Sequence, residues 1–254
     1  LLTPDTAKKI YNTTSEMLTT KDFSVRNLLR KMNIEVICTT DDPIDNLKMH
    51  QQIKNDNFEI KVLPTWRPDS AMNISNPNTY NQYLDSLSNV SNIDISTFDK
   101  LIEALRKRHE YFAQNGCKSS DHGVETLYSV DYNYYEIEKI FSRLRARKEI
   151  TTEEILKFKS AMCYEFGLMD NERGWVQQWH IGVFRNNNTR LFNQLGADKG
   201  FDSIGDFNIG ASLVRFLDNL DKNNKLTKTI LYNINPSDNA LIATMIGNFQ
   251  DGTL

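Results

Sequence analysis

The chain has 254 residues, of which 39% are hydrophobic and 25% charged, with a formal net charge of −3. This length allows a sizeable core, built as one large domain or two small ones. The small negative charge gives no reason to expect nucleic acid or an anionic membrane as a partner. No apolar run approaches the roughly 20 residues that are needed to span a bilayer.

The number and spacing of the cysteines indicate the cellular compartment of the protein. Cys38, Cys117 and Cys163 lie far apart and show no metal-binding spacing. An odd and sparse set of this kind favours a reducing cytoplasm over a disulfide framework. We therefore expect a cytoplasmic protein.

Helical patterns recur along the chain and carry recognisable start and stop signals. Pro43 follows Asp42 and is expected to begin a helix, because proline is tolerated at the first helical position. Ser96 is expected to begin another that stops at Gly116, and Thr151 to form a capping box with the glutamates that follow it. The predicted helices cover about residues 4–20, 24–33, 44–53, 96–116, 155–166 and 237–249.

Short segments rich in β-branched and apolar residues separate these helices. The predicted strands are 34–40, 58–66, a weak one at 116–123, 174–182 and 228–235. Strands that alternate with helices indicate parallel β-α units. No repeat or linker divides the chain, so we predict one domain.

Polar residues gather at the carboxyl end of each predicted strand, in the sequences TTDDP (39–43), TWRPD (65–69), SSDHG (119–123), HIGVFR (180–185) and NINPSD (233–238). An α/β barrel builds its active site from these positions. An open doubly wound sheet also binds ligands there, but mainly at one switch point. Polar groups after every strand favour the barrel, although five strands do not close an eight-stranded one. Together with a start at Leu1 rather than Met, this predicts an internal piece of a longer protein.

Three residues after these strands are candidates for a site. Arg67 precedes a rigid proline and offers a guanidinium for a carboxylate or phosphate, with an ion pair to Asp69 as the structural alternative. Asp121 is a candidate to move a proton or orient a sugar hydroxyl. Its neighbour His122 is expected to point to the opposite face, so at most one of the two enters the site. A turn aspartate beside a surface histidine is the alternative.

His180 lies at the end of its predicted strand. An imidazole at such a position can be a metal ligand or a hydrogen-bond donor in a site, and a purely structural histidine is an equally good interpretation. The residues after it, Arg185, Asn186, Asn187, Asn188 and Arg190, offer donors for polyhydroxylated or anionic ligands. A loop whose asparagines bond their own backbone is the alternative. We expect His50 and His109 on the surface of their helices. Asp42 is expected to be a helix cap rather than a catalyst.

Several longer motifs together resemble one family. They are TTDDPIDNL (39–47), WRPD (66–69), GCKSSDHG (116–123), HIGVFRNNNTR (180–190), GFDSIGD (200–206), KTILYNINPSDN (228–239) and ATMIGNFQ (243–250). These motifs look like those of uronate isomerase, also called glucuronate isomerase, and the similarity runs the whole length of the chain.

The resemblance implies a (β/α)8 barrel of the amidohydrolase superfamily, of which this chain covers strands two to six as the central portion of a single domain. It implies interconversion of D-glucuronate with D-fructuronate, and of D-galacturonate with D-tagaturonate, through an enediol. By the matching motifs, Arg67, Asp121 and His180 correspond to active-site residues of the family, with His180 near the metal. Arg67, Arg185 and Asn188 are then expected to bind the substrate.

This sequence also departs from the family pattern. The family holds a divalent metal, usually taken as zinc, with an H-x-H pair on its first strand and an aspartate in a T-D-S-R motif after its last. Neither motif occurs here, and the only histidines are His50, His109, His122 and His180. We therefore expect the main metal ligands to lie outside this chain, and the chain alone to be inactive.

Two alternatives to the isomerase stay open at this point. One is a metal-dependent hydrolase of the same superfamily, and the other is a non-catalytic module that binds sugar acids. The expected partner is a small uronate, with no nucleic acid and no membrane. Assembly into a homo-oligomer is an open alternative.

Overall fold

The computed structural model describes residues 1–250, which fall into two compact units. Unit 1 consists of Leu1–Thr39 and Leu47–Leu63. Unit 2 consists of Thr40–Asn46 and the chain from Pro64 onward. Both contain helices and parallel strands, so the predicted α/β class is confirmed. None of the helices in residues 1–250 has the length and apolar character needed to cross a membrane.

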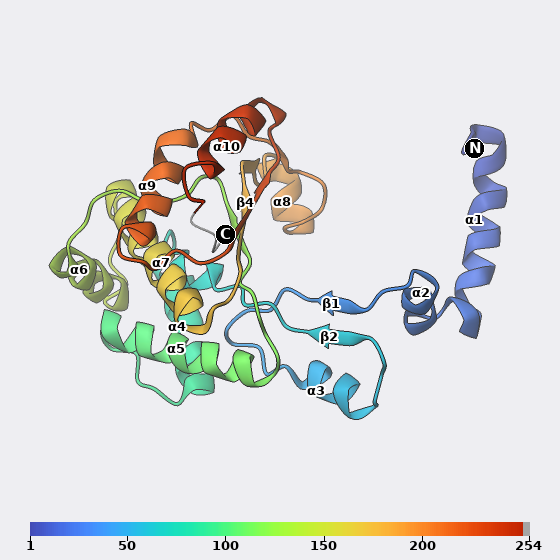
Figure 1. Ribbon diagram of the computed structural model, residues 1–254, viewed down its shortest axis with the longest axis horizontal. Coiled ribbons are helices and arrows are strands. Elements are labelled where there is room, and N and C mark those ends of the chain that lie inside the picture. Colours follow the sequence, from blue (N-terminus) through green and yellow to red (C-terminus); the bar gives the residue numbers. More distant parts are fainter. Residues whose placement is uncertain (251–254) are drawn as a thin grey trace. The chain divides into compact units, whose positions relative to one another are not determined.

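Unit 1 pairs two short parallel strands and carries three α-helices (Figure 1). Its strands are β1 (Val36–Cys38) and β2 (Lys61–Leu63), and its helices are α1 (Pro4–Leu18), η1 (Lys21–Phe23), α2 (Val25–Lys31) and α3 (Lys48–Asn55). The two predicted N-terminal helices are confirmed as α1 and α2.

The predicted helix start at Asp42-Pro43 is wrong. Helix α3 begins only at Lys48, because Leu47 before it has a left-handed backbone with φ of 52°. The side chain of Asp42 instead accepts a hydrogen bond from the backbone N–H of Ile44 at 3.1 Å, so it caps a turn.

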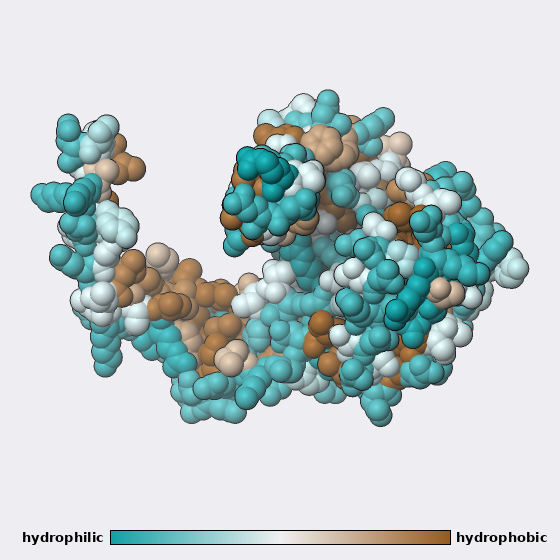
Figure 2. All heavy atoms as spheres, turned by 180° about the vertical axis from the view of Figure 1, so that it is seen from behind, coloured by the Kyte–Doolittle hydropathy of each residue, from teal (hydrophilic) through white to brown (hydrophobic). Residues whose placement is uncertain are grey.

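Unit 1 keeps much of its apolar surface uncovered. Among its described residues, the buried hydrophobic side chains are those of Leu47 and Ile60, whereas Val25, Met32 and Val36 are exposed. Figure 2 shows brown, hydrophobic atoms gathered on this N-terminal part. The main hydrophobic core therefore belongs to unit 2.

The parallel strands of unit 2 bring distant parts of the sequence together. Asp41 lies beside Trp66, Trp66 beside Ser120, and Ser119 beside Val176, each as a parallel bridge. The order then continues through β3 (His122–Val124), β4 (Gln177–Ile181) and β7 (Thr229–Asn233), with His122 beside Trp179 and Gln177 beside Thr229. A strand is thus found at each of the five predicted places, and each is shorter than its sequence pattern; β3 overlaps only the last two residues of the predicted segment 116–123.

Helices of unit 2 cover one face of these strands. In Figure 1, α4, α5, α6, α7 and α9 lie on one side of β4, and α8 lies on the other. On the covered face Trp179 packs edge-on against Phe216 of α9, and His122 stacks on Phe166 of α7. The elements are η2 (Asp69–Met72), α4 (Pro77–Ser91), α5 (Phe98–Gln114), α6 (Tyr134–Arg145), α7 (Thr152–Arg173), α8 (Thr189–Leu195), α9 (Gly210–Asp221), η3 (Pro236–Asp238) and α10 (Asn239–Ile246).

Local capping explains where several of these helices begin and end. Thr151 and Glu154 form the predicted capping box of α7, and Gly174, in a left-handed conformation, ends that helix. Helix α5 is capped by Thr97 rather than by Ser96, because the Thr97 hydroxyl accepts from the backbone of Lys100. A side-chain cap of this kind stabilises a helix by about 1 kcal/mol.

A short antiparallel pair that the sequence pattern did not predict follows β4. Strand β5 (Val183–Phe184) pairs with β6 (Ser203–Ile204), which closes the loop that contains α8. The polar residues after His180 therefore belong to a folded hairpin and not to an open loop.

Candidate functional site

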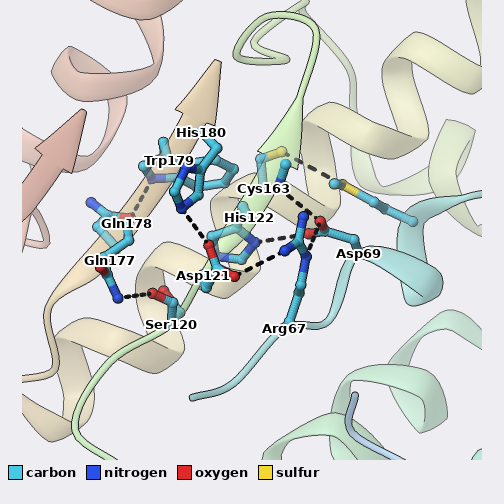
Figure 3. A network of polar contacts seen from close by, with 12 residues as sticks. Arg67, Asp69, Ser120, Asp121, His122, Cys163, Gln177, Gln178, Trp179 and His180 are labelled. Atoms are coloured by element: carbon cyan, nitrogen blue, oxygen red, sulfur yellow. Dashed lines mark hydrogen bonds and ion pairs between the residues drawn. The ribbon is translucent and has the colours of Figure 1, made fainter. Parts of the chain in front are cut away.

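The structure brings together the three residues that the sequence places at the ends of predicted strands. Arg67, Asp121 and His180 come from three neighbouring parallel segments, and their side chains converge on one another (Figure 3). Arg67 Nη1 donates to Asp121 Oδ2 at 3.0 Å, and His180 Nε2 lies 3.0 Å from Asp121 Oδ1. Asp121 is thus the centre of the group.

Asp121 is buried, yet one of its oxygens lacks a hydrogen bond. Oδ2 accepts from Arg67 and, at 3.2 Å, from the hydroxyl of Thr40. Oδ1 faces His180 at an ion-pair distance but without hydrogen-bond geometry, and it has no other partner in the described chain. Because buried polar atoms nearly always have a partner, an unsatisfied carboxylate oxygen marks a place where chemistry or a ligand is expected.

His180 is the exposed member of the group, with 46% of its side chain accessible. Its ring stacks on Tyr232 of β7, with centroids 4.3 Å apart and planes 8° apart. The Tyr232 hydroxyl in turn donates to Gln178 Oε1 at 3.0 Å. This stack holds the His180 imidazole over the strands, and part of the ring stays accessible to solvent.

Gly123 gives Arg67 the room to reach this position. A Cβ atom at Gly123 would clash with Arg67 Nη2, and it would lie 3.6 Å from Arg185 Nη2. Two guanidinium groups therefore approach the same glycine. Guanidinium groups in such a place favour the carboxylate of a small molecule as ligand.

Asp69 joins Arg67 to His122, which the sequence pattern did not indicate. Asp69 accepts from Arg67 Nε at 3.2 Å, from the backbone N–H of Gly123 at 2.8 Å, and from His122 Nδ1 at 3.1 Å. Burial favours a higher pKa for Asp69, but the contacts with His122, Gly123 and Arg67 outweigh it and hold the pKa below its usual value. Arg67 thus forms the ion pair with Asp69 that was considered as a structural alternative, and it contacts Asp121 at the same time.

His122 and Asp121 point to opposite faces, as their adjacency on a strand predicts. The ring of His122 is fully buried and stacks between Trp179, at 4.0 Å, and Phe166, at 5.4 Å. The surface histidine considered as an alternative is therefore excluded. Nε2 of His122 has no hydrogen-bond partner in the described chain.

The polar residues after β4 mostly stabilise their own hairpin. Arg185 Nη1 pairs with Asp202 at 2.7 Å, and Asn187 Nδ2 donates to Ser203 Oγ at 2.8 Å. Asn188 caps α8 by accepting from Leu191 N at 3.0 Å. Of this set, Arg185 approaches the group around Asp121 through Gly123, whereas Asn188 is engaged in its cap.

The expectation that His109 lies on the surface is wrong. Its ring is buried beside Trp175, with Nε2 3.3 Å from Asp170 Oδ1 and Nδ1 accepting from Arg173 Nε at 3.1 Å. It is buried because it continues the apolar face of α5, four residues after Leu105. His50 is half-buried and bonds the Thr39 hydroxyl at 2.7 Å.

Metal ligands are sparse in the part of the chain that the structure describes. No group of three or more His, Cys, Asp or Glu side chains is gathered there in a way that could hold a metal ion. At the site, Asp121 Oδ1 and His180 Nε2 are two donor atoms that face each other. A zinc site takes three or four protein ligands, so these two residues do not fit a complete site by themselves.

The fold and the site define a class of protein. It is an α/β protein in which an arginine, a carboxylate and an imidazole meet after parallel strands, an arrangement suited to proton transfer on a small anionic molecule. The family model described as glucuronate isomerase matches residues 1–254, and the chain belongs to this family. The resemblance drawn from the sequence motifs is therefore confirmed.

Individual relatives agree with the family assignment. The chain is 54% identical over 254 residues to a uronate isomerase of Bacteroides thetaiotaomicron, covering 100% of the chain and 54% of that protein. Identity to a uronate isomerase of Cellvibrio japonicus is 53%, with the same coverage. The chain spans about half the length of the curated relatives it matches.

A solved structure shows the same arrangement of elements. The crystal structure of a uronate isomerase from Thermotoga maritima superposes with a TM-score of 0.89 at 33% identity, covering 98% of this chain and 54% of that one. A glucuronate isomerase from Caulobacter crescentus gives a TM-score of 0.84 at 28% identity, covering 94% and 49%.

Proposed function

We propose that this chain supplies the substrate-facing half of a uronate isomerase. The enzyme would interconvert D-glucuronate with D-fructuronate, and D-galacturonate with D-tagaturonate. The convergence of Arg67, Asp121 and His180 carries this proposal, because each corresponds to a family active-site residue and both Arg67 and His180 lie within ion-pair distance of Asp121.

Arg67 is proposed to bind the uronate carboxylate. Its side chain is part-buried, and two of its nitrogens are held by carboxylates, so its position is fixed before a substrate arrives. Arg185 approaches from the other side of Gly123 and would contribute a second positive charge. Asn188 would act on the substrate side through its cap of α8, which shapes the hairpin that carries Arg185.

The reaction requires a proton to move between two neighbouring carbons. The C2–H bond breaks and its electrons form the C1–C2 double bond of an enediol, while the C1 carbonyl oxygen takes up a proton. The C2 hydroxyl then loses its proton to become the carbonyl, and the electrons of the double bond take up a proton at C1. Carbon 1 is reduced and carbon 2 oxidised, so no external redox partner is needed. Asp121 is proposed to move this proton through its unsatisfied Oδ1, with His180 orienting the carboxylate.

A divalent metal, expected to be zinc in this family, would polarise the oxygens of the substrate when bound. Asp121 and His180 do not complete a site for it, so His180 would lie beside the metal while the main ligands come from outside this chain. We propose accordingly that the chain alone does not turn over uronates. Zinc-dependent turnover by the purified chain at the rate of an intact relative would contradict this.

The wider setting is proposed from the same resemblance. Residues 1–254 would be the central portion of one (β/α)8 barrel domain of the amidohydrolase superfamily, supplying strands two to six. The parallel order from Asp41 to β7 supports this arrangement. Cys38 and Cys163 are free thiols, which fits the expected cytoplasmic location. Assembly into a homo-oligomer stays a proposal.

An exchange protein tests the function. This chain replaces the matching segment of the Bacteroides thetaiotaomicron relative, and the product is assayed with D-glucuronate and zinc by following ketose formation. Turnover comparable to that of the unmodified relative is expected. Calorimetric binding of glucuronate without turnover would favour a non-catalytic binding module, and hydrolysis of an amide or ester substrate instead would favour a hydrolase.

A further inference from the structure

We infer that Asp69 and His122 are a positioning pair that sets the orientation of the Arg67 guanidinium toward the substrate carboxylate. The inference rests on the proposed function, since it assigns a role in binding the uronate. Neither residue is expected to touch the substrate. Their effect is exerted through Arg67.

Asp69 accepts hydrogen bonds from three groups, one of which is the Arg67 guanidinium. Its Oδ2 accepts from Gly123 N at 2.8 Å and from Arg67 Nε at 3.2 Å, while its Oδ1 is bonded by His122 Nδ1 at 3.1 Å. A carboxylate that accepts from a backbone amide and a buried ring has little freedom to rotate. The guanidinium bonded to it is therefore fixed as well.

His122 is built into the core, which makes it a firm support. Its ring is fully buried between Trp179 and Phe166. Its Nε2 has no hydrogen-bond partner among the described residues, so Asp69 is the polar group that the ring bonds. A buried polar ring with one unsatisfied nitrogen is unfavourable for stability alone. The unfavourable burial of Nε2 is explained if the other ring nitrogen, Nδ1, serves to orient Asp69.

The geometry leaves one part of Arg67 for the substrate. Asp69 holds Nε and Asp121 holds Nη1, so two carboxylates on different edges fix the rotation of the planar group (Figure 3). Nη2 lies over Gly123, toward Arg185. Without Asp69, the guanidinium is free to turn and to engage Asp121 with both Nη atoms, which removes it from the substrate.

The first experiment compares Asp69→Asn with Asp131→Asn in the exchange protein. Asp131 also faces an arginine, Arg215 at 3.4 Å, but is almost fully exposed. Asp69→Asn is expected to raise KM for glucuronate about tenfold while kcat changes much less, because ground-state binding is lost. Asp131→Asn should leave both constants unchanged. A purely structural role would instead lower the melting temperature and the active fraction without changing KM.

A double-variant cycle tests whether Asp69 acts through Arg67. In an Arg67→Lys background, which has no Nε and no planar group to orient, Asp69→Asn is expected to cause no further rise in KM. If the two effects on KM multiply instead, Asp69 does not act through Arg67 and the inference is overturned.

Two substitutions at His122 separate packing from positioning. His122→Phe keeps an aromatic ring between Trp179 and Phe166 but removes Nδ1, so KM should rise as with Asp69→Asn. His122→Asn places an amide nitrogen near the position of Nδ1 but loses the stack. Its KM should therefore stay near that of the unsubstituted exchange protein, while its melting temperature falls. The opposite ranking of the two KM values would show that His122 serves packing alone.

The unsubstituted exchange protein keeps the two hypotheses distinct. If it does not convert glucuronate, the proposed function fails before any variant is measured. If it does convert glucuronate and Asp69→Asn keeps a wild-type KM, the positioning pair fails while the function stands.

Discussion

Unit 2 contains two polar networks built from the same residue types, and they differ in how completely they are satisfied. The site network consists of Arg67, Asp69, Asp121, His122 and His180. The core network consists of His109, Ser120, Asp170 and Arg173. Both contain an aspartate bonded to a histidine, and adjacent residues, Ser120 and Asp121, connect them along the chain.

The core network has both oxygens of its carboxylate occupied. Asp170 is buried, its Oδ2 accepts from Ser120 Oγ at 2.5 Å, and its Oδ1 lies 3.3 Å from His109 Nε2. In the site network, by contrast, Asp121 Oδ1 and His122 Nε2 lack hydrogen bonds and His180 is exposed. A fully satisfied buried network stabilises and specifies a fold, whereas the unsatisfied Asp121 Oδ1 beside the exposed His180 indicates a ligand site.

Asp121→Asn is the strongest test of this contrast. The amide has no carboxylate to move a proton, so kcat for glucuronate in the exchange protein should fall by roughly 10²- to 10⁴-fold. The melting temperature should change little, because the amide oxygen still accepts from Arg67. An unchanged kcat would place Asp121 among the structural residues.

Asp170→Asn should show the reverse profile. Ser120 and His109 lose a charged acceptor, so the free energy of unfolding should fall by about 2–3 kcal/mol in denaturant titrations. KM of the folded protein should stay unchanged. Asp85→Asn is the control, since Asp85 lies 3.6 Å from Arg145 at the surface and such a pair contributes about 0–1 kcal/mol. A raised KM in Asp170→Asn would erase the distinction between the networks.

Gly123→Ala probes the space on which the site network depends. The new Cβ would displace the Arg67 guanidinium, so KM should rise about tenfold, which corresponds to about 1.4 kcal/mol of binding. Gly247→Ala is the matched control, because its Cβ would meet its nearest atom at an ordinary 3.4 Å. Equal KM values for the two alanine variants would contradict the close approach of Arg67.

The smallest expected effect is a pH dependence at Asp69. Its pKa in the folded protein lies below the usual 3.8, so its charge stabilises the fold above that value. This stability is lost as the pH falls through the folded pKa, because the unfolded state binds the proton more readily. The difference in unfolding free energy between wild type and Asp69→Asn should therefore be constant near neutral pH and shrink below about pH 4. If this difference in unfolding free energy grew on acidification instead, the pKa of Asp69 would be raised in the folded protein and the prediction would be wrong.

The sequence predicts the strands and the main site residues for a simple physical reason. Arg67 and His180 each end a segment rich in apolar residues, and Asp121 ends a weaker strand pattern. In parallel β-α units such positions meet at one edge of the sheet. The α/β class follows from the same alternation. Each strand is shorter than its predicted segment, since neighbouring residues such as Trp66 and Ser120 pair only through isolated bridges.

What the sequence pattern missed depends on contacts between distant residues. The bond between Asp69 and His122 joins residues 53 positions apart, and no local spacing encodes it. His109 looked exposed because histidine is polar, yet Asp170 and Arg173, more than 60 positions later, satisfy both of its nitrogens. Leu47 interrupts a helical pattern through a left-handed backbone that its residue type does not indicate.

Contacts between tryptophan and histidine rings give each network its own optical reporter. The chain has three tryptophans. Trp66 and Trp175 both lie against His109, whereas Trp179 stacks on His122. Since the emission of an indole depends on what lies against its ring, emission from Trp179 reports the position of the His122 ring, and emission from the other two reports the core network. Variants that keep one tryptophan at a time would therefore follow the site network and the core network separately.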